Sequence, residues 1–494
     1  MTEPTDVRNA ARAFLVAAFG RLREDAVIPT PVFHPVVRTG RDFYGHRIDD
    51  LASYASFEDR LMTAYPTVFS AHRDDAYAEF PSTFVFSLLE ATVARCGRVR
   101  EFDPTGPPVE ESIDEMLSLL EGAPQRVLCC RVVSNLTSDG GERVRLGDVC
   151  VVPQQAAKSL ERIIADEIPA AADELNRRRP YGFGSPLSLV IAEGTTTAAD
   201  VFTFSEELSR RVDRFLRDVR LLTGGTIRSA HEVLGTTTLV TRMPPQLVSF
   251  PLGGQLRRVW RSAYVSKSDA TAHAGLRTLI ESIEVRRQGV LATSIGVAVS
   301  KFNSTFHRGE TPFEHIVELA TALEAALGGG ESDNAGLTLR LRSRAAALLA
   351  TRDDPADKIF GDIGLIYAIR STLVHGGEIK TKDLRKATNG ISTIPRELPA
   401  DMFGITLSHV ADRMRDLVRR AILARLCLAA GANPPWPFHI AVPVDARLSD
   451  DTTRAAWRAY WRQRLADLEA PHAAERQILA TDLMSDARQR SQER

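Results

Sequence analysis

The chain has 494 residues, of which 44% are apolar and 25% are charged, and its formal net charge is −1. The length suggests two to four domains with substantial cores, and the composition is that of an ordinary globular protein. A net charge near zero argues against a protein that coats nucleic acid through bulk electrostatics. Any contact with nucleic acid must be local.

The five cysteines are odd in number and contain no CxxC pair. This pattern makes structural zinc and a disulfide framework improbable, so we expect no metal and no cofactor. The first 25 residues have an amphipathic helical pattern but too many charges for a signal peptide. No apolar run is long enough to span a bilayer. We therefore expect a cytoplasmic protein that does not contact membranes.

Residues 30–250 mix strand and helix patterns. The expected strands are 126–136, 144–153, 186–194 and 236–243, and the expected helices include 156–168 and 204–222. The loop SDGGER between the first two strands is a strong hairpin signal. These patterns predict an α+β fold, with a mixed N-terminal domain of mostly antiparallel strands. This domain carries no Walker A loop, no GxGxxG after a strand, no HExxH and no GxSxG.

From residue 295 onward the patterns are helical. Thr311, Pro312 and Glu314 form a capping box with proline at the first helical position. Further helices are expected at 337–350, from Asp354 to Gly377, and at 399–430. The last of these has an apolar side and many arginines elsewhere, which predicts either a solvated helix with intrahelical ion pairs or a surface that faces RNA.

The helix LIYAIRSTLVHGG at 365–377 carries Arg370 and His375. A guanidinium offers a planar fork of donors that fits a phosphate, and an imidazole exchanges protons near neutral pH. Together they could help the 2′-hydroxyl of RNA attack the adjacent phosphorus without a metal. Five residues turn a regular helix by roughly 140°, so the helix must distort or a second element, such as another copy of this helix, must complete the site. The alternative is an arginine paired with a carboxylate and a surface histidine.

From Ile295 to Gly431 the chain resembles the Apea-like branch of the HEPN superfamily, whose active members are RNases with an Arg-x(4–6)-His motif. The resemblance rests on four segments in the right order: 295–327, 337–350, the motif helix and the long helix after it. Tyr367 before the arginine, Ser371 after it and glycine after the histidine match the motif. Ser371 is a possible catalytic helper. Many other HEPN RNases carry Asn, Asp or His at this position of the motif.

The resemblance implies a homodimeric, metal-independent endoribonuclease. In it His375 would be the general acid or base, Arg370 would hold the scissile phosphate, and the product would carry a 2′,3′-cyclic phosphate. Such proteins often act as bacterial toxins or antiphage effectors, with a phage or host trigger. The competing hypothesis is a non-catalytic bundle that dimerises or binds a nucleotide, with an N-terminal domain that recognises a protein.

The expected domains are an α+β sensor or regulatory domain (1–265), an all-α HEPN helical bundle (266–432) and a C-terminal helical extension (433–494). Trp457 and Trp461, four residues apart, predict that the extension docks through an aromatic stripe. Glu324 is interpreted as a partner of Arg344 inside the bundle. The candidate RNA-binding residues are Arg340, Arg344, Tyr367 and Arg419.

Overall fold

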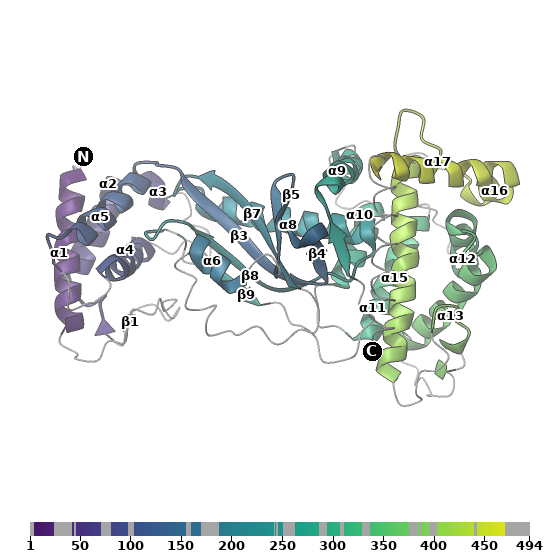
Figure 1. Cartoon of the computed structure of the whole chain (residues 1–494), viewed down its shortest axis with the longest axis horizontal. Coiled ribbons are helices and arrows are strands. Elements are labelled where there is room, and N and C mark those ends of the chain that lie inside the picture. Colours follow the sequence, from purple (N-terminus) through teal and green to yellow (C-terminus); the bar gives the residue numbers. More distant parts are fainter. Residues whose placement is uncertain are drawn as a thin grey trace. The chain divides into compact units, whose positions relative to one another are not determined.

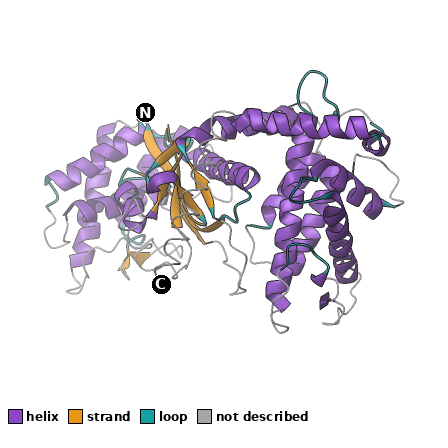
Figure 2. Cartoon of the chain, turned by 45° about the vertical axis from the view of Figure 1, so that its right-hand side comes forward, coloured by secondary structure: helices purple, strands orange, loops and turns teal. Residues whose placement is uncertain are grey.

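The computed structural model describes residues 4–23, 42–43, 46–70, 81–96, 103–154, 160–168, 187–241, 243, 246–249, 262–285, 294–306, 311–328, 336–374, 384–385, 388–394, 403–438 and 442–469. The chain divides into two compact units that are discontinuous in sequence. Unit 1 comprises residues 1–143, 148–214 and 230–249, and unit 2 comprises residues 144–147, 215–229 and 250–494. Helices and an antiparallel sheet are both present, as predicted for an α+β protein (Figure 2).

Unit 1 begins with a group of helices that share one apolar core. These helices are α1 (Pro4–Arg23), α2 (Ala52–Ala64), α3 (Pro66–Ser70), α4 (Pro81–Cys96) and α5 (Pro107–Leu120). A short strand pair, β1 (Asp42–Phe43) and β2 (His46–Arg47), lies between the first two. The amphipathic pattern expected in the first 25 residues is therefore a helix, and its apolar face, which includes Phe14, Leu15 and Leu22, is fully buried.

The sheet follows these helices (Figure 1). Its strands are β3 (Gln125–Ser134), β5 (Val144–Leu146), β6 (Val149–Pro153), β7 (Leu187–Thr196), β8 (Arg228–Thr236) and β9 (Gln246–Ser249), in the spatial order β5-β6-β7-β3-β8-β9. The longest pairing joins β3 to β7 antiparallel over ten residues, from Gln125 opposite Thr196 to Ser134 opposite Leu187. Two further short strands are β4 (Leu136–Ser138) and β10 (Ala263–Val265).

Two strand predictions were wrong. The segments 126–136 and 144–153 do not form a hairpin, because β7 lies between β3 and β6 in the sheet. The chain instead turns at Gly147, which has a φ of 63°, and this turn separates β5 from its neighbour β6. The strand expected at 236–243 lies earlier, at 228–236, and it includes two charged side chains, Arg228 and Glu232, that are buried.

Helices cover both faces of the sheet. α8 (Val201–Thr223) contributes Asp213 and Ser209 to hydrogen bonds with Arg131 of β3, and Arg131 also bonds to Glu232 of β8. Arg126 of β3 bonds to Glu167 of α6 (Leu160–Glu167) at 2.8 Å. Residues 126 and 131 differ in parity and so point to opposite faces of a strand. Almost all of β3 is consequently buried.

Unit 2 is built on a helical bundle. Its helices are α9 (Ala270–Val285), α10 (Ser294–Ser304), α11 (Pro312–Leu327), α12 (Leu337–Leu349), α13 (Ala356–Val374), α15 (Phe403–Leu428), α16 (Val444–Ser449) and α17 (Asp451–Glu469). The predicted capping box is confirmed, since Thr311 and Glu314 satisfy each other's backbone N–H groups and Pro312 is the first helical residue. α11 contacts both α15 and α13, so the segments quoted for the family resemblance share one core.

The C-terminal helices belong to the same core. Trp457 and Trp461 of α17 are both buried, as the aromatic spacing predicted. The ring of Trp457 stacks on that of Trp436, with 6.0 Å between the ring centroids. The indole N–H of Trp461 donates to the carbonyl of Leu348 in α12. The aromatic stripe therefore fixes α17 against α12 and α15.

Candidate functional site

The apolar face of α13 continues into the motif arginine. Ile359, Ile363 and Ile366 are fully buried, Tyr367 is 6% exposed and Arg370, one turn later, is half-buried. Residues spaced by three or four lie on one side of a helix, so Arg370 stands where the next core residue would be expected. A cation at the end of a buried face needs a compensating group or a ligand.

Glu324 of α11 and Arg370 both lie close enough to Tyr367 of α13 to influence its pKa. The hydroxyl of Tyr367 donates to the carbonyl of Ala320 at 3.1 Å. Burial raises the pKa of Tyr367 well above its usual value, and Glu324 raises it further, while the positive charge of Arg370 lowers it. Tyr367 is therefore protonated at neutral pH and acts as a hydrogen-bond donor rather than a base. The carboxylate of Glu324 thus lies by Tyr367, whereas sequence analysis had paired it with Arg344.

The guanidinium of Arg370 has donors to offer. Its Nε is buried and has no hydrogen-bond partner in the described part of the chain. Ser371 is exposed, while His375 and the two glycines after it lie outside the described residues. The described end of α13 thus presents an arginine and a serine hydroxyl, two groups that suit binding of an oxyanion.

Two of the candidate RNA-binding arginines are engaged inside the protein. Arg344 is 2% exposed and forms two bonds of 2.7 Å with the carboxylate of Asp445 in α16, besides bonding to the carbonyl of Leu327. Arg419 donates to the carbonyl of Leu221 at 3.1 Å and pairs with Asp416. Both guanidiniums hold helices together, which argues against a role in binding RNA. Arg340 is half-buried.

The long helix α15 is less exposed to solvent than its arginines suggest. Arg413 is 5% exposed and bonds to Asp362 of α13 at 2.8 Å and to Asp354 before that helix. Asp362 also accepts from Ser392, so α13 is held by a buried ionic cluster. The intrahelical ion pairs that the sequence predicted as one alternative for this helix occur as well, as in the pair of Arg419 with Asp416.

Sequence analysis did not single out Asp362. It was missed because a lone aspartate in an apolar helix is recognisable only by its partner 51 residues away. A cavity of about 300 Å³ adjoins this cluster, and its lining combines three aspartates with Lys358 and two arginines. The charges balance, which makes the cluster a support for α13 rather than a site for an ion.

Comparison with known proteins gives no relative. No family model matches the chain, and no curated protein and no solved structure is similar to it. Within the described residues, no helix is long and apolar enough to cross a membrane, and no group of three or more His, Cys, Asp or Glu side chains could hold a metal ion.

Proposed function

We propose that this protein is a metal-independent endoribonuclease whose active site is built on α13, in a bundle of the HEPN type. The observation that carries the proposal is the guanidinium of Arg370 at the end of the buried face of α13, whose buried Nε has no hydrogen-bond partner among the described residues. Such a group is suited to a phosphate that arrives with the substrate.

In the proposed reaction the 2′-hydroxyl of a ribose attacks the adjacent phosphorus. Its proton passes to a base, the bond from phosphorus to the 5′-oxygen of the next nucleotide breaks, and that oxygen takes a proton from an acid. The products are a 2′,3′-cyclic phosphate and a 5′-hydroxyl. His375 serves as the acid or base, Arg370 stabilises the negative charge on the phosphoryl oxygens, and Ser371 can donate a hydrogen bond.

Three features support this proposal. The helices expected from the family resemblance occur in the expected order, and they share one core. Tyr367, which matches the motif, anchors α13 to α11 through the carbonyl of Ala320. Asp362 is held by Arg413, so the helix that carries Arg370 is fixed on two sides. A cation that is already held in place lowers the activation barrier more than a mobile one, because it does not have to reorganise during the reaction.

The proposed enzyme is a homodimer in which two copies of α13 contribute to one cleft. This arrangement would resolve the angular separation of Arg370 and His375 along a regular helix. The enzyme would act as a toxin or an antiphage effector, and unit 1 would sense a phage or host trigger. Expression of the wild type in bacteria should then arrest growth, and the Arg370→Ala variant should not.

The decisive test is cleavage of labelled tRNA and total RNA in EDTA. Wild type should cut the RNA and leave cyclic-phosphate ends, whereas His375→Ala and Arg370→Ala should lose about a hundred-fold or more in rate. Arg370→Lys should recover only part of the rate, because an ammonium keeps the charge but not the planar fork. The matched control is Arg352→Ala, which removes an exposed arginine just before α13.

Cleavage that is unchanged in both the Arg370→Ala and His375→Ala variants would remove these residues from the mechanism. If the purified protein does not cleave RNA, the growth assay decides between the nuclease and the non-catalytic bundle, since cells supply the trigger. A protein that neither cuts RNA nor arrests growth would favour the non-catalytic alternative, a bundle for dimerisation or nucleotide binding.

A further inference from the structure

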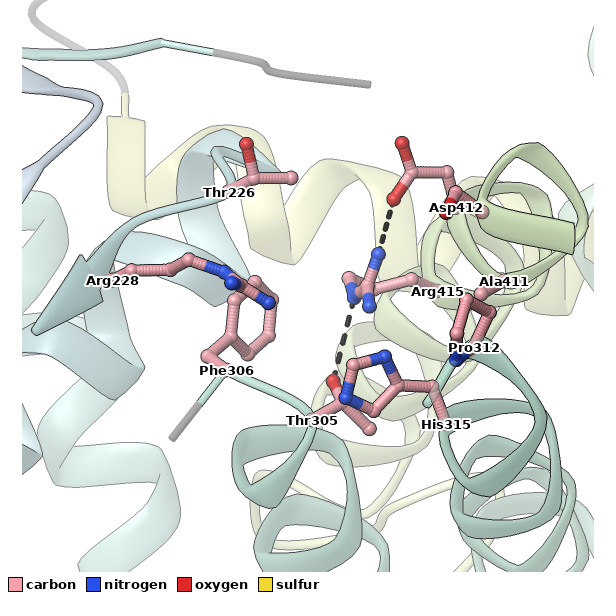
Figure 3. Close-up of a pocket in the computed structure, with 10 residues that line it drawn as sticks. Thr226, Arg228, Thr305, Phe306, Pro312, His315, Ala411, Asp412 and Arg415 are labelled. Atoms are coloured by element: carbon pink, nitrogen blue, oxygen red, sulfur yellow. Dashed lines mark hydrogen bonds and ion pairs between the residues drawn. The ribbon is translucent and has the colours of Figure 1, made fainter. Parts of the chain in front are cut away.

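Several arginines inside the helical bundle of unit 2 are paired with aspartates. Arg344 of α12 pairs with Asp445 of α16. Figure 3 shows a small pocket in which Arg415 of α15 is hydrogen-bonded to Asp412 and to the hydroxyl of Thr305. The charge of each of these guanidinium groups is therefore balanced by a carboxylate of the protein itself.

Arg342 of α12 has a different environment. Its Nε donates to the carbonyl of Phe360 in α13 at 2.9 Å, and its guanidinium carbon lies over the Phe360 ring, 3.9 Å from the centroid. Both partners are neutral. Within the described part of the chain, no carboxylate forms an ion pair with Arg342, and its two terminal nitrogens keep their N–H donors.

A glycine of α13 also fixes the position of this guanidinium. A Cβ at Gly364 would lie 2.7 Å from Cζ of Arg342 and 2.9 Å from its Nε, so any side chain there would displace the group. Glycine inside a helix costs roughly 1 kcal/mol relative to alanine. The close approach of Arg342 to α13 thus lowers the stability of this helix, while it holds a cation in one place.

Arg342 lies over the face of α13 that leads to Ser371. Phe360, Gly364, Ala368 and Ser371 are spaced by four, four and three residues, so they share one side of the helix. Ala368 and Ser371 are exposed, and α12 packs along α13. From Gly364 to Ser371 the helix rises about 10 Å. A stacked nucleic-acid strand has a phosphate about every 3.4 Å, so this length corresponds to about three nucleotides.

The exposed carboxylate on this side of α13 lies in the other direction. Asp357 precedes Gly364 by seven residues, about 10 Å along the helix and away from Ser371. Salt largely screens an exposed charge beyond about 8 Å at physiological ionic strength. The surface between Arg342 and Ser371 therefore suits an anionic ligand.

We propose that Arg342 binds a phosphate of the RNA strand within about three nucleotides of the cut, while Arg370 and Ser371 bind the scissile phosphate. The inference rests on the proposed function, since it assigns a second contact with the same substrate. The bound phosphate does not react, so the contact is equally strong in the ground state and the transition state. Arg342 should therefore lower KM without changing kcat.

The test is the binding of a labelled 2′-O-methyl oligoribonucleotide, whose blocked 2′-oxygens cannot attack, to the full-length protein at several salt concentrations. Arg342→Gln should weaken binding about ten-fold, as expected for one hydrogen-bonded charge. It should also reduce the slope of log K against log salt by about 0.7, the value for one phosphate of a single strand. Arg342→Lys should keep the slope and recover part of the affinity, because an ammonium keeps the charge but not the planar fork.

Two glycines of α13 provide a matched pair of variants that leave Arg342 in the chain. Gly364→Ala displaces the guanidinium and should weaken RNA binding, but it should have little further effect in the Arg342→Gln protein. Gly361→Ala adds the same methyl group to the same helix at a point where nothing lies within 4 Å. This control should bind RNA as wild type does.

A wild-type salt slope in Arg342→Gln, or equal losses in Gly361→Ala and Gly364→Ala, would overturn the role of Arg342 and leave the nuclease proposal standing. Cleavage assays separate the two proposals further. Loss of cleavage in Arg370→Ala together with an unchanged KM in Arg342→Gln would support the nuclease and reject the second contact. A wild-type protein that neither binds nor cuts RNA would overturn both.

Discussion

The protonation of Glu90 on α4 should influence the stability of unit 1. Its Oε1 is buried without a hydrogen-bond partner in the described part of the chain. Burial raises the pKa of this carboxyl from 4.5 to about 8. The neutral acid is thus the form that suits the folded state, and the unfolded chain ionises at a much lower pH.

This difference fixes the sign of a pH effect. Below pH 4.5 both states hold the proton, and between pH 4.5 and about 8 only the folded state does, so stability falls as pH rises through this window and levels off above it. Glu90→Gln removes the titration. We expect it to be more stable than wild type near pH 8, by on the order of a few kcal/mol, and to differ little near pH 4.

The measurement is chemical unfolding of both proteins at several pH values. Glu111→Gln is the control, since its side chain is 66% exposed and should leave the pH dependence of wild type intact. Parallel pH profiles for wild type and Glu90→Gln would show that Glu90 is ionised in the folded state.

Among the helices, α11 allows a clean test of a predicted element. Thr311 caps it by accepting a hydrogen bond from the backbone N–H of Glu314. Thr311→Ala should destabilise unit 2 by about 1 kcal/mol, a drop of roughly 2–4 °C in melting temperature, and Thr311→Ser should recover most of it. Thr338→Ala, an exposed change in the first turn of α12, should have a smaller effect. Equal losses in the two alanine variants would mean that the cap contributes nothing.

The helices of the bundle could be predicted because their signals are local. The capping box of Thr311, the apolar spacing along α13 and the paired tryptophans of α17 each lie within a few turns of one helix. The order of the strands could not be predicted, because it depends on which distant segments pair. β7 separates β3 from β6, and it begins 34 residues after β6 ends.

Charged residues limited the prediction in the same way. β8 was placed too late in the chain because a strand with a buried Glu232 resembles a solvated segment until its partner, Arg131, is known. At the candidate site, Arg370 and Tyr367 were recognisable from the motif. The contact of Glu324 with Tyr367 and the support of Asp362 by Arg413 were not, since each joins different helices.

At the scale of the whole molecule, each unit contains a core of its own. Phe57 is fully buried in the helical core of unit 1, and Leu323 is fully buried in the bundle of unit 2. The segment Phe215–Ser229 belongs with the bundle although it is remote in sequence, because Arg220 binds Asn303 of α10. No local pattern marks such a segment.

Separate cores predict separate responses to core substitutions. Leu323→Ala should destabilise unit 2 by about 2–5 kcal/mol. Hydrogen exchange should then accelerate in α10, α11 and α15 while α1, α4 and α5 keep the exchange rates of wild type. Phe57→Ala should give the opposite pattern. Acceleration throughout the chain from either change would indicate that the two units unfold as one.

The ion pair of Arg344 with Asp445 has a consequence for where the bundle can be shortened. A fragment that ended after α15 would remove Asp445, which makes two hydrogen bonds to the buried guanidinium of Arg344, and it would also remove the tryptophans of α17 that pack against α12. Removal of one partner from a buried ion pair costs several kcal/mol, a large part of the stability of a domain. The smallest autonomous form of the bundle therefore extends through α17, and proteolysis or a premature stop codon before it should yield an insoluble product.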